Sequence, residues 1–314
     1  DPSAAFARAR SACDTARSAN PNARGPLGTL LWALSHQADY VADHGGDVPS
    51  LREEAERIFV GSGALGTTSP MALSALVSIN TATADAAFVH GQDPTPYIDR
   101  ALWLLDAEAK LGPLASHVEQ DRGGLYGRRA LYEAKQGRSP VANLERGIEA
   151  NQRAIALDPL AFGAYGNVAT SAELICEYEL AFGRPCTSSI DRATAAAFAL
   201  ISLHAGRSLG YQRLGEIFWY RMRSRLIADV DPEPLLQHLG WWSEIALRNK
   251  PDLTYVRINQ GDAYRFVAEH RLRIDGGRLT NPAAPPMPTP FPKPPPAPPL
   301  PKPPLPIDPP SALL

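Results

Sequence analysis

The chain has 314 residues, and 44% of them are hydrophobic, which is enough apolar material for a long continuous core. Its 31 Lys and Arg residues nearly balance its 33 Asp and Glu residues, and the net charge of −2 creates no field that would attract nucleic acid or an anionic membrane. The longest uninterrupted apolar stretch, around Ala195–Leu203, is shorter than the roughly 20 residues that a membrane span needs. We therefore expect neither a nucleic-acid partner nor a membrane span.

The cysteines indicate the compartment. Cys13, Cys176 and Cys186 are too few and too scattered to form a disulfide framework or a thiolate metal site. Cys176 falls on an apolar helical stripe, which favours a core position. No signal peptide is visible at the start, so a reducing, cytoplasmic location is the default expectation. The first residue is Asp1 rather than Met, which suggests a section of a longer chain.

Four series of residues recur with a period of 46. Each series is spaced by 46 residues or a multiple of 46. They are the turn glycines Gly45, Gly91, Gly137 and Gly183, the prolines Pro21, Pro113, Pro159 and Pro251, the small residues Gly123, Ala169, Gly215 and Gly261, and the small residues Ala55, Ala101, Gly147 and Ala193. Asp229 and Asp275 continue the glycine series. Because all four share one register, the period predicts a repeat architecture.

In chain order, residues 1–20 are predicted to form a second helix that lacks a first. Each following period predicts two helices, and apolar residues at steps of three and four mark the buried stripe of the first, as in Ala161–Phe182. Gly183 ends that helix because glycine tolerates the left-handed conformation. The last element, 252–274, is predicted to be a first helix that lacks a second.

The second helix of each period has a recognisable start and end. Asp93-Pro94 and Ser139-Pro140 are predicted to be an N-cap followed by the first helical residue, where the missing N–H of proline does no harm. The helix ends before Pro159 or Pro251, because proline disfavours helix at the preceding residue.

The small residues within helices indicate close packing. A glycine inside a helix costs about 1 kcal/mol relative to alanine. We expect Gly123, Gly215 and Gly261 to offset this cost through close helix–helix contact. An acidic residue followed by arginine recurs before the other small series, as Asp99-Arg100, Glu145-Arg146 and Asp191-Arg192.

These features resemble tetratricopeptide (TPR) repeats. Gly123 with Tyr126, Gly215 with Phe218 and Gly261 with Tyr264 resemble the first TPR helix, and Ala154 and Ala246 resemble the end of the second. TPR units span 34 residues, so the longer period implies longer helices. The resemblance implies a right-handed α-solenoid over residues 1–275, with about five helix pairs and a half repeat at each end.

A closer resemblance concerns Gly147–Pro159 and the Ala-Tyr-Gly-Asn-Val-Ala that follows. This segment is similar to the TPR-like tails of bacterial serine/threonine protein kinases. That resemblance implies a regulatory or scaffolding module with a kinase domain upstream. No kinase motif occurs in the chain. We therefore expect no enzymatic activity, no cofactor and no metal.

One segment matches a phosphate-binding motif. Gly61–Gly66 matches G-x-G-x-x-G, but the charged, helical pattern of Arg52–Val60 precedes it instead of a strand. A turn between repeats explains the glycines. The seven histidines include no pair at metal-ligand spacing.

By analogy with TPR grooves, first-helix residues near the small position should line a ligand-binding surface. The candidates are Gln120, Gly124, Arg128, Gln212, Glu216, Trp219, Tyr220, Asp262 and Arg265. The basic runs Arg122–Arg129 and Arg221–Arg225 are either solvated faces or contacts for an acidic partner. The aromatic residues Phe218–Tyr220 and Trp241-Trp242 are either packed between repeats or exposed as binding anchors.

Residues 276–314 are a tail or linker. From Asn281 onward the chain holds 17 of its 31 prolines, which predicts a polyproline II spacer or disorder. The leading hypothesis is a protein- or peptide-binding scaffold. A small-ligand or enzymatic groove, and a structural spacer that self-associates through open repeat ends, are the alternatives.

Overall fold

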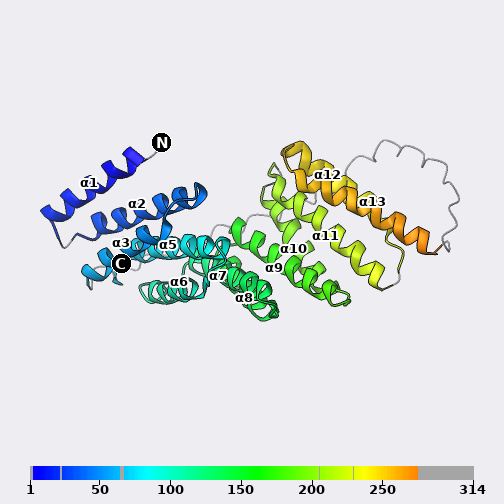
Figure 1. The fold of residues 1–314 in the computed structure, drawn as a ribbon, viewed down its shortest axis with the longest axis horizontal. Coiled ribbons are helices and arrows are strands. Elements are labelled where there is room, and N and C mark those ends of the chain that lie inside the picture. The colour runs from blue at the N-terminus through cyan, green and yellow to red at the C-terminus, as the bar shows by residue number, and fades with distance from the viewer. Residues whose placement is uncertain (1–2, 22, 64–66, 205, 229, 275–314) are drawn as a thin grey trace, which may run out of the picture.

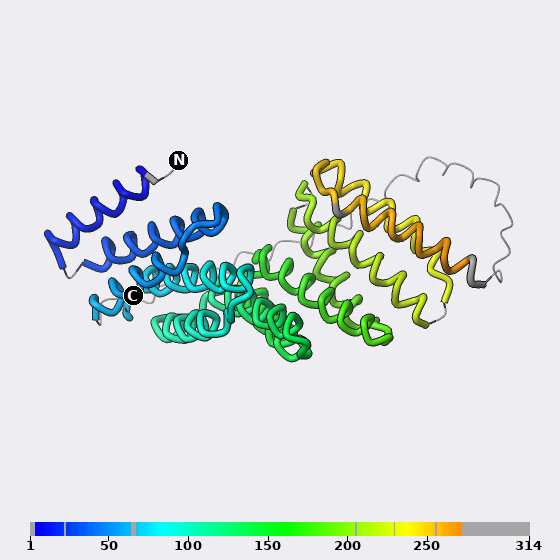
Figure 2. The backbone as a smooth tube through the Cα atoms, in the orientation of Figure 1, coloured from blue at the N-terminus to red at the C-terminus, as the bar shows by residue number. Residues whose placement is uncertain are grey.

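The computed structural model describes residues 3–21, 23–63, 67–204, 206–228 and 230–274. These residues form twelve α-helices and one short 3-10 helix, and they include no strand. Figure 1 shows the helices in chain order along an extended row, from α1 (Ser3–Ala19) to α13 (Thr254–Ile274). The tube in Figure 2 follows the same path. The predicted proline-rich tail lies outside the described residues, as do Asp229 and Asp275.

The helices repeat with the period of the sequence. The first helices, each beginning 46 residues after the one before, are α2 (Arg24–Asp43), α5 (Pro70–Val89), α7 (Ser116–Lys135), α9 (Phe162–Ala181), α11 (Ser208–Ile227) and α13. The second helices are α1, α3 (Val48–Gly61), α6 (Thr95–Glu108), α8 (Val141–Leu157), α10 (Thr187–Leu203) and α12 (Leu236–Asn249), the last preceded by η1 (Glu233–Leu235). The predicted helix pairs are confirmed, with 20 residues in most first helices.

The turn glycines adopt the left-handed conformation that the sequence predicts. The φ angles of Gly45, Gly91, Gly137 and Gly183 lie between 67° and 72°. At each turn the residue after the glycine donates its N–H to a carbonyl five residues earlier. These bonds run from Gly46 to Val41, Gln92 to Ala87, Arg138 to Glu133 and Arg184 to Glu179, at 2.8 to 2.9 Å. This is the Schellman pattern, and it satisfies carbonyls that the helix end would otherwise leave bare.

The second helices begin one residue later than predicted. The prediction that Asp93 is the N-cap is wrong, although its carboxylate accepts a hydrogen bond from the N–H of Thr95 at 2.9 Å. The helix starts at Thr95, and Pro94 is the N-cap, where its carbonyl accepts from Ile98 at 3.1 Å. Pro140 stands in the same place before α8.

Buried apolar side chains form successive core clusters along the row. One cluster joins α2, α3, α5, α6 and α7, the next joins α7 to α11, and another joins α11, η1, α12 and α13. Each first helix also contacts the first helix of the following pair. The first helices therefore form a connected surface from α2 to α13.

Two of the three helical glycines make the close contacts we expected. A β-carbon on Gly123 would lie 2.9 Å from the carbonyl oxygen of Gly147 and overlap the Asn151 amide, and one on Gly215 would lie 3.0 Å from the Ser243 hydroxyl. The expectation for Gly261 is wrong, because a β-carbon there would meet no atom of the described residues within 4 Å. Gly123 packs on the second helix of its own pair, whereas the equivalent segment after α13 lies outside the described residues.

The recurring acidic–Arg pairs join successive helices in opposite directions. Asp99 of α6 pairs forward with Arg129 of α7, while Arg100 pairs back with Glu56 of α3 through two hydrogen bonds of 2.9 and 2.7 Å. Two later contacts repeat this arrangement, Glu145 with Arg192 at 2.6 and 2.7 Å and Asp191 with Arg221 at 3.1 Å. In the middle pair, Arg146 instead contacts Asn143 of its own helix at 3.4 Å, so the two-way arrangement holds for the first and third pairs.

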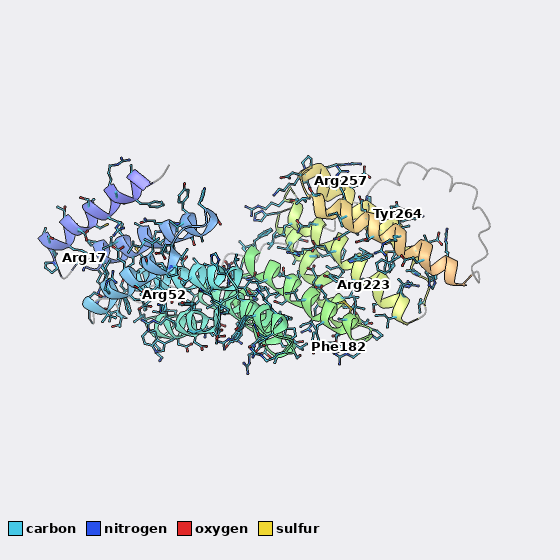
Figure 3. All side chains as sticks on the ribbon, viewed as in Figure 1. Arg17, Arg52, Phe182, Arg223, Arg257 and Tyr264 are labelled. Atoms are coloured by element: carbon cyan, nitrogen blue, oxygen red, sulfur yellow. A yellow bond between two sulfur atoms is a disulfide. The ribbon has the colours of Figure 1, made fainter. Side chains whose placement is uncertain are left out.

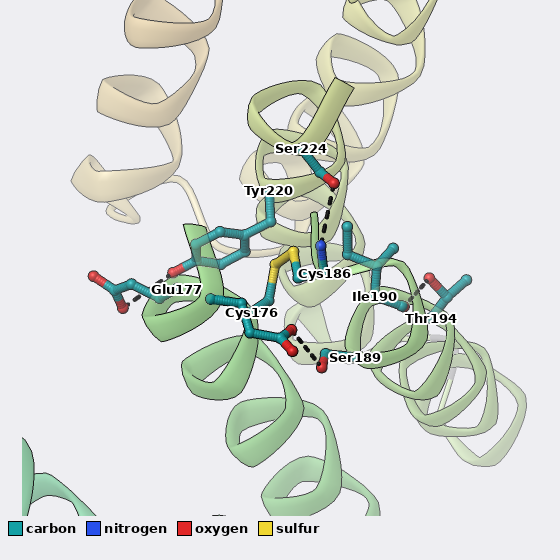
Figure 4. Close-up of a disulfide and its surroundings, with 9 residues drawn as sticks. Cys176, Glu177, Cys186, Ser189, Ile190, Thr194, Tyr220 and Ser224 are labelled. Atoms are coloured by element: carbon teal, nitrogen blue, oxygen red, sulfur yellow. Dashed lines mark hydrogen bonds between the residues drawn. A yellow bond between two sulfur atoms is a disulfide. The ribbon is translucent and has the colours of Figure 1, made fainter. Parts of the chain in front are cut away.

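The expectation that the cysteines form no disulfide is wrong. Cys176 on α9 and Cys186 at the start of α10 are joined, with Cα atoms 4.9 Å apart, as Figure 4 shows. The turn after α9 folds residue 186 back onto the helix, so ten residues of separation in sequence become contact in space. Cys186 occupies the place between Pro140 and Pro232 in the series of residues that includes Pro94. Cys13 is buried and free.

The helix α5 is long and apolar enough to cross a membrane by length and composition alone. It has 20 residues, which makes it longer than the apolar stretch around Ala195–Leu203 that we considered in the sequence. In its most apolar window, 61% is buried by neighbouring helices. That burial is what a core helix requires, because the neighbouring helices already cover its apolar side chains.

Candidate functional site

The connected surface of first helices contains two hollows. The larger, with a volume of about 380 Å³, lies over α2, α5, α7 and α9, and we call it the acidic hollow. Three of the nine predicted site residues, Gln120, Gly124 and Arg128, line it. Other lining residues are Trp32, Asp39, Ser78, Thr81, Asp85, Asp121 and Asn167.

Charge in the acidic hollow is mainly negative. Arg128 pairs with Asp85 through two hydrogen bonds of 2.7 and 2.9 Å, which leaves Asp39 and Asp121 as further carboxylates. Burial raises the pKa of Asp121, and the charge of Glu108 adds to this shift, while His117 and Arg128 oppose it. Burial likewise raises the pKa of Asp39, with Asp43 and Asp85 adding to it and His36 opposing it.

The second hollow, of about 260 Å³, lies over α9, α11 and α13, and we call it the Glu173 hollow. Glu216, Trp219 and Tyr220, three more of the predicted residues, line it. Figure 3 labels Arg223 on α11 and Tyr264 on α13, the two helices on its C-terminal side. Its remaining lining residues are Thr170, Glu173, Leu174, Arg213 and Asn259.

The two hollows use the same positions of the repeat. Ser78 and Gly124 line the first, and Thr170 and Glu216 line the second, each 46 residues after the one before. Both hollows are therefore parts of one surface that recurs along the row of first helices.

Three predicted residues lie outside both hollows. Gln212 is partly buried on α11. Asp262 and Arg265 pair with each other at 3.2 Å on α13, and Arg265 also meets Glu269 at 3.0 Å. These two side chains are about half exposed, so this end of the predicted site is an open, self-paired helix surface.

Several residues that line the hollows were not among the candidates chosen from the sequence. Glu173 lies 46 residues before Trp219, which was chosen, so applying the period in full would have found it. Arg213 and Asp121 are likewise two periods apart, with Asn167 between them. Trp32, which is 41% exposed, lies one period before Ser78 and three periods before Thr170, which lines the Glu173 hollow.

The arginines of the basic run in α7 form ion pairs. Arg122 meets Asp106 at 2.8 Å and Glu119 at 3.2 Å, Arg128 meets Asp85, and Arg129 meets Asp99. Glu119 is buried and also accepts a hydrogen bond from Arg153 at 2.7 Å. These arginines join helices, which leaves the run little free charge for an acidic partner.

The three consecutive aromatic residues of α11 pack between helices. The Phe218 ring stacks on His238 of α12 at 5.3 Å, and Trp219 meets Phe266 of α13 at 4.9 Å. The Tyr220 hydroxyl donates to Glu177 of α9 at 3.5 Å. Trp219 and Tyr220 serve both expected roles, because they pack between repeats and also line a hollow.

Two further sequence features concern phosphate binding and metal binding. Gly61 ends the helix α3, and Gly63 adopts a left-handed conformation, so a helix and not a strand precedes this part of the G-x-G-x-x-G motif; Ala64–Gly66 lie outside the described residues. Among the described residues no group of three or more His, Cys, Asp or Glu side chains is placed to hold a metal ion.

Comparisons with family models and with curated protein sequences found no match. The functional conclusion therefore depends on the repeat and the surface alone.

Proposed function

We propose that the chain is a non-catalytic scaffold that binds a protein or peptide segment along its first helices. The repeated surface is the observation that supports this, because its two hollows use equivalent positions of successive repeats. An extended ligand meets equivalent positions at regular intervals, which suits a polypeptide better than a compact small molecule. Concave surfaces of repeat proteins commonly bind this way.

We further propose that the helix pairs form a right-handed, TPR-like α-solenoid. The 46-residue spacing of helix starts and the contacts between successive first helices support it. The resemblance to bacterial kinase tails makes a regulatory module of such a kinase the best-supported biological setting. The coding sequence upstream tests that setting, since a kinase domain would have to precede the repeats.

The binding proposal is tested by photo-cross-linking. Peptides are selected from a random displayed library on the immobilised chain. A photoreactive amino acid is then placed at Ser78 or Thr170, on the first-helix surface, or at exposed Glu149 on α8 as the matched control. We expect cross-links from Ser78 and Thr170 and none from Glu149. Cross-links from Glu149 alone, or no enriched peptide, would contradict the proposal.

A further inference from the structure

We propose that the Glu173 hollow is the receptor for one arginine side chain of the bound polypeptide. This inference rests on the proposed function, and it names the chemistry that one position of the surface recognises. It is carried by a buried acidic group with an unpartnered oxygen, by aromatic walls and by the size of the hollow.

Two carboxylates in the hollow share one nitrogen atom. The Nη1 atom of Arg213 lies 2.9 Å from Glu173 and 2.6 Å from Glu216. No other ion pair reaches either carboxylate within the described part of the chain. The Glu173 side chain is only 6% exposed, and its Oε1 atom is buried without a hydrogen-bond partner among the described residues. A buried carboxylate oxygen left in this state is costly unless a proton or a cation neutralises it.

Without a bound cation, a proton on the Glu173 carboxyl group neutralises its negative charge. Burial raises the pKa of Glu173 to about 8, and Glu216 adds to the shift while Arg213 opposes it. The titratable groups that act on Glu173 are on α11, where Tyr220 lies beside Arg213 and Glu216. On α7, Arg128 is engaged by Asp85, and α13 contributes the uncharged Asn259. A cation that enters the hollow would therefore displace the proton on Glu173.

The walls of the hollow favour a guanidinium group. Trp219 and Tyr220 present aromatic rings, and contacts with Phe266 and Glu177 fix their positions. Figure 4 shows the Tyr220 hydroxyl on Glu177, next to the disulfide that holds the end of α9. A guanidinium stacks on aromatic faces while its planar N–H groups bind carboxylates, and an ammonium group lacks this geometry.

The size of the hollow favours a single side chain. Its volume of about 260 Å³ is below the roughly 300–1,000 Å³ of sites that hold a whole small ligand. The Glu216 side chain is 15% exposed and that of Glu173 is 6% exposed, so Glu216 is the more accessible carboxylate. An arginine side chain that enters from a polypeptide on the surface meets Glu216 first and comes to rest above Glu173.

The experiment uses the full chain and a capped tripeptide, N-acetyl-Gly-Arg-Gly-amide. Its binding is followed by NMR at the indole N–H of Trp219 over a range of pH. Below a pKa of about 8 the affinity should rise close to tenfold per pH unit, and it should level off above that pH, because binding displaces one proton. The same peptide with citrulline, which has the shape of arginine without its charge, should bind at least tenfold more weakly.

Two variants locate the effect. Glu173→Gln keeps the size of the side chain and removes its titration, so it should weaken binding and abolish the pH dependence. Glu149→Gln, at an exposed residue of the second helix α8 outside both hollows, is the matched control and should change neither. Circular dichroism establishes that both variants are folded.

Several results would overturn the inference. These are an affinity that does not change between pH 6 and pH 8, equal binding by the citrulline peptide, unchanged binding by Glu173→Gln, or no binding of the arginine peptide at all. Equal binding by a lysine counterpart would overturn the assignment to guanidinium. If library peptides still cross-link through Ser78 and Thr170 in any of these cases, the proposed function stands and only the arginine receptor falls.

Discussion

Arg128 of α7 holds Asp85 of α5 through two parallel hydrogen bonds, at 2.7 and 2.9 Å, within the acidic hollow. The two residues are 43 positions apart, so the pair joins neighbouring first helices. The side chains are 36% and 49% exposed, and solvent therefore screens their attraction. Such a pair fixes the positions of side chains in the acidic hollow more than it stabilises the fold.

We expect Arg128→Ala to leave stability nearly unchanged and to alter ligand binding. The free energy of unfolding should fall by less than about 1 kcal/mol, since the pair is exposed to solvent. Affinity for a library-selected peptide should change by severalfold, because Asp85 loses its neutralising partner. Urea unfolding and a binding titration measure the two effects. A large loss of stability with unchanged binding would show that the pair is structural.

The close approach of α7 and α8 gives a second prediction. Gly123→Ala places a methyl group against the Gly147 carbonyl and the Asn151 amide, and such overpacking should cost about 1–3 kcal/mol. Gly261→Ala is the matched control, because its methyl group meets no atom of the described residues within 4 Å and it removes a helical glycine. It should be neutral or stabilise the chain by up to about 1 kcal/mol. Urea unfolding of both variants checks this contrast, and equal destabilisation would contradict the packing account.

Reduction of the disulfide should destabilise the chain. Cross-linking residues ten apart restricts the unfolded ensemble, and the chain-entropy estimate for a loop of this length is roughly 3 kcal/mol. Unfolding midpoints with and without reductant measure the loss. Cys176→Ala should remove the sensitivity to reductant, whereas Cys13→Ala should retain it because Cys13 is free. Unchanged sensitivity in Cys176→Ala would contradict this pairing.

The same disulfide bears on location. The few, scattered cysteines led us to expect a cytoplasmic location. Structural disulfides, however, are typical of oxidising compartments. Thiol trapping in intact cells should find Cys176 and Cys186 protected from alkylation if the compartment is oxidising. Alkylation of both would support the cytoplasmic proposal.

Glu173 should make stability fall as pH rises. Its pKa is raised from an ordinary 4.5 to about 8, so the folded chain holds one more proton than the unfolded chain between these values. Its contribution is fully present below pH 4.5 and is lost as pH rises through 8, with a slope of up to about 1.4 kcal/mol per pH unit. Glu173→Gln should remove that slope when urea unfolding is compared at pH 5.5, 6.5 and 7.5. Parallel curves for both proteins would contradict a raised pKa.

Periodicity predicted the helix pairs because turn glycines and prolines act locally. Gly45 and its equivalents need a left-handed backbone whatever the tertiary packing is, so the sequence alone located the helix ends. Cys186 was different, because its partner is reached only after the turn folds back onto α9. Gly261 was assigned a close contact that depends on a neighbouring segment, which the spacing of glycines cannot supply.

The candidate surface was predictable in part for the same reason. Six of the nine residues that analogy selected line the two hollows. The hollows themselves depend on which side chains are small or displaced, as with Gly124 beside Arg128. The burial of Glu173, which gives its hollow its chemistry, follows from packing between α9 and α11 and could not be read from residue type.

Hydrogen–deuterium exchange with a bound, library-selected peptide tests the central claim most directly. If the surface of first helices is the binding site, the peptide should slow exchange in α5, α7, α9 and α11 and leave α6, α8 and α10 unchanged. Protection confined to the second helices, or none at saturating peptide, would contradict the claim.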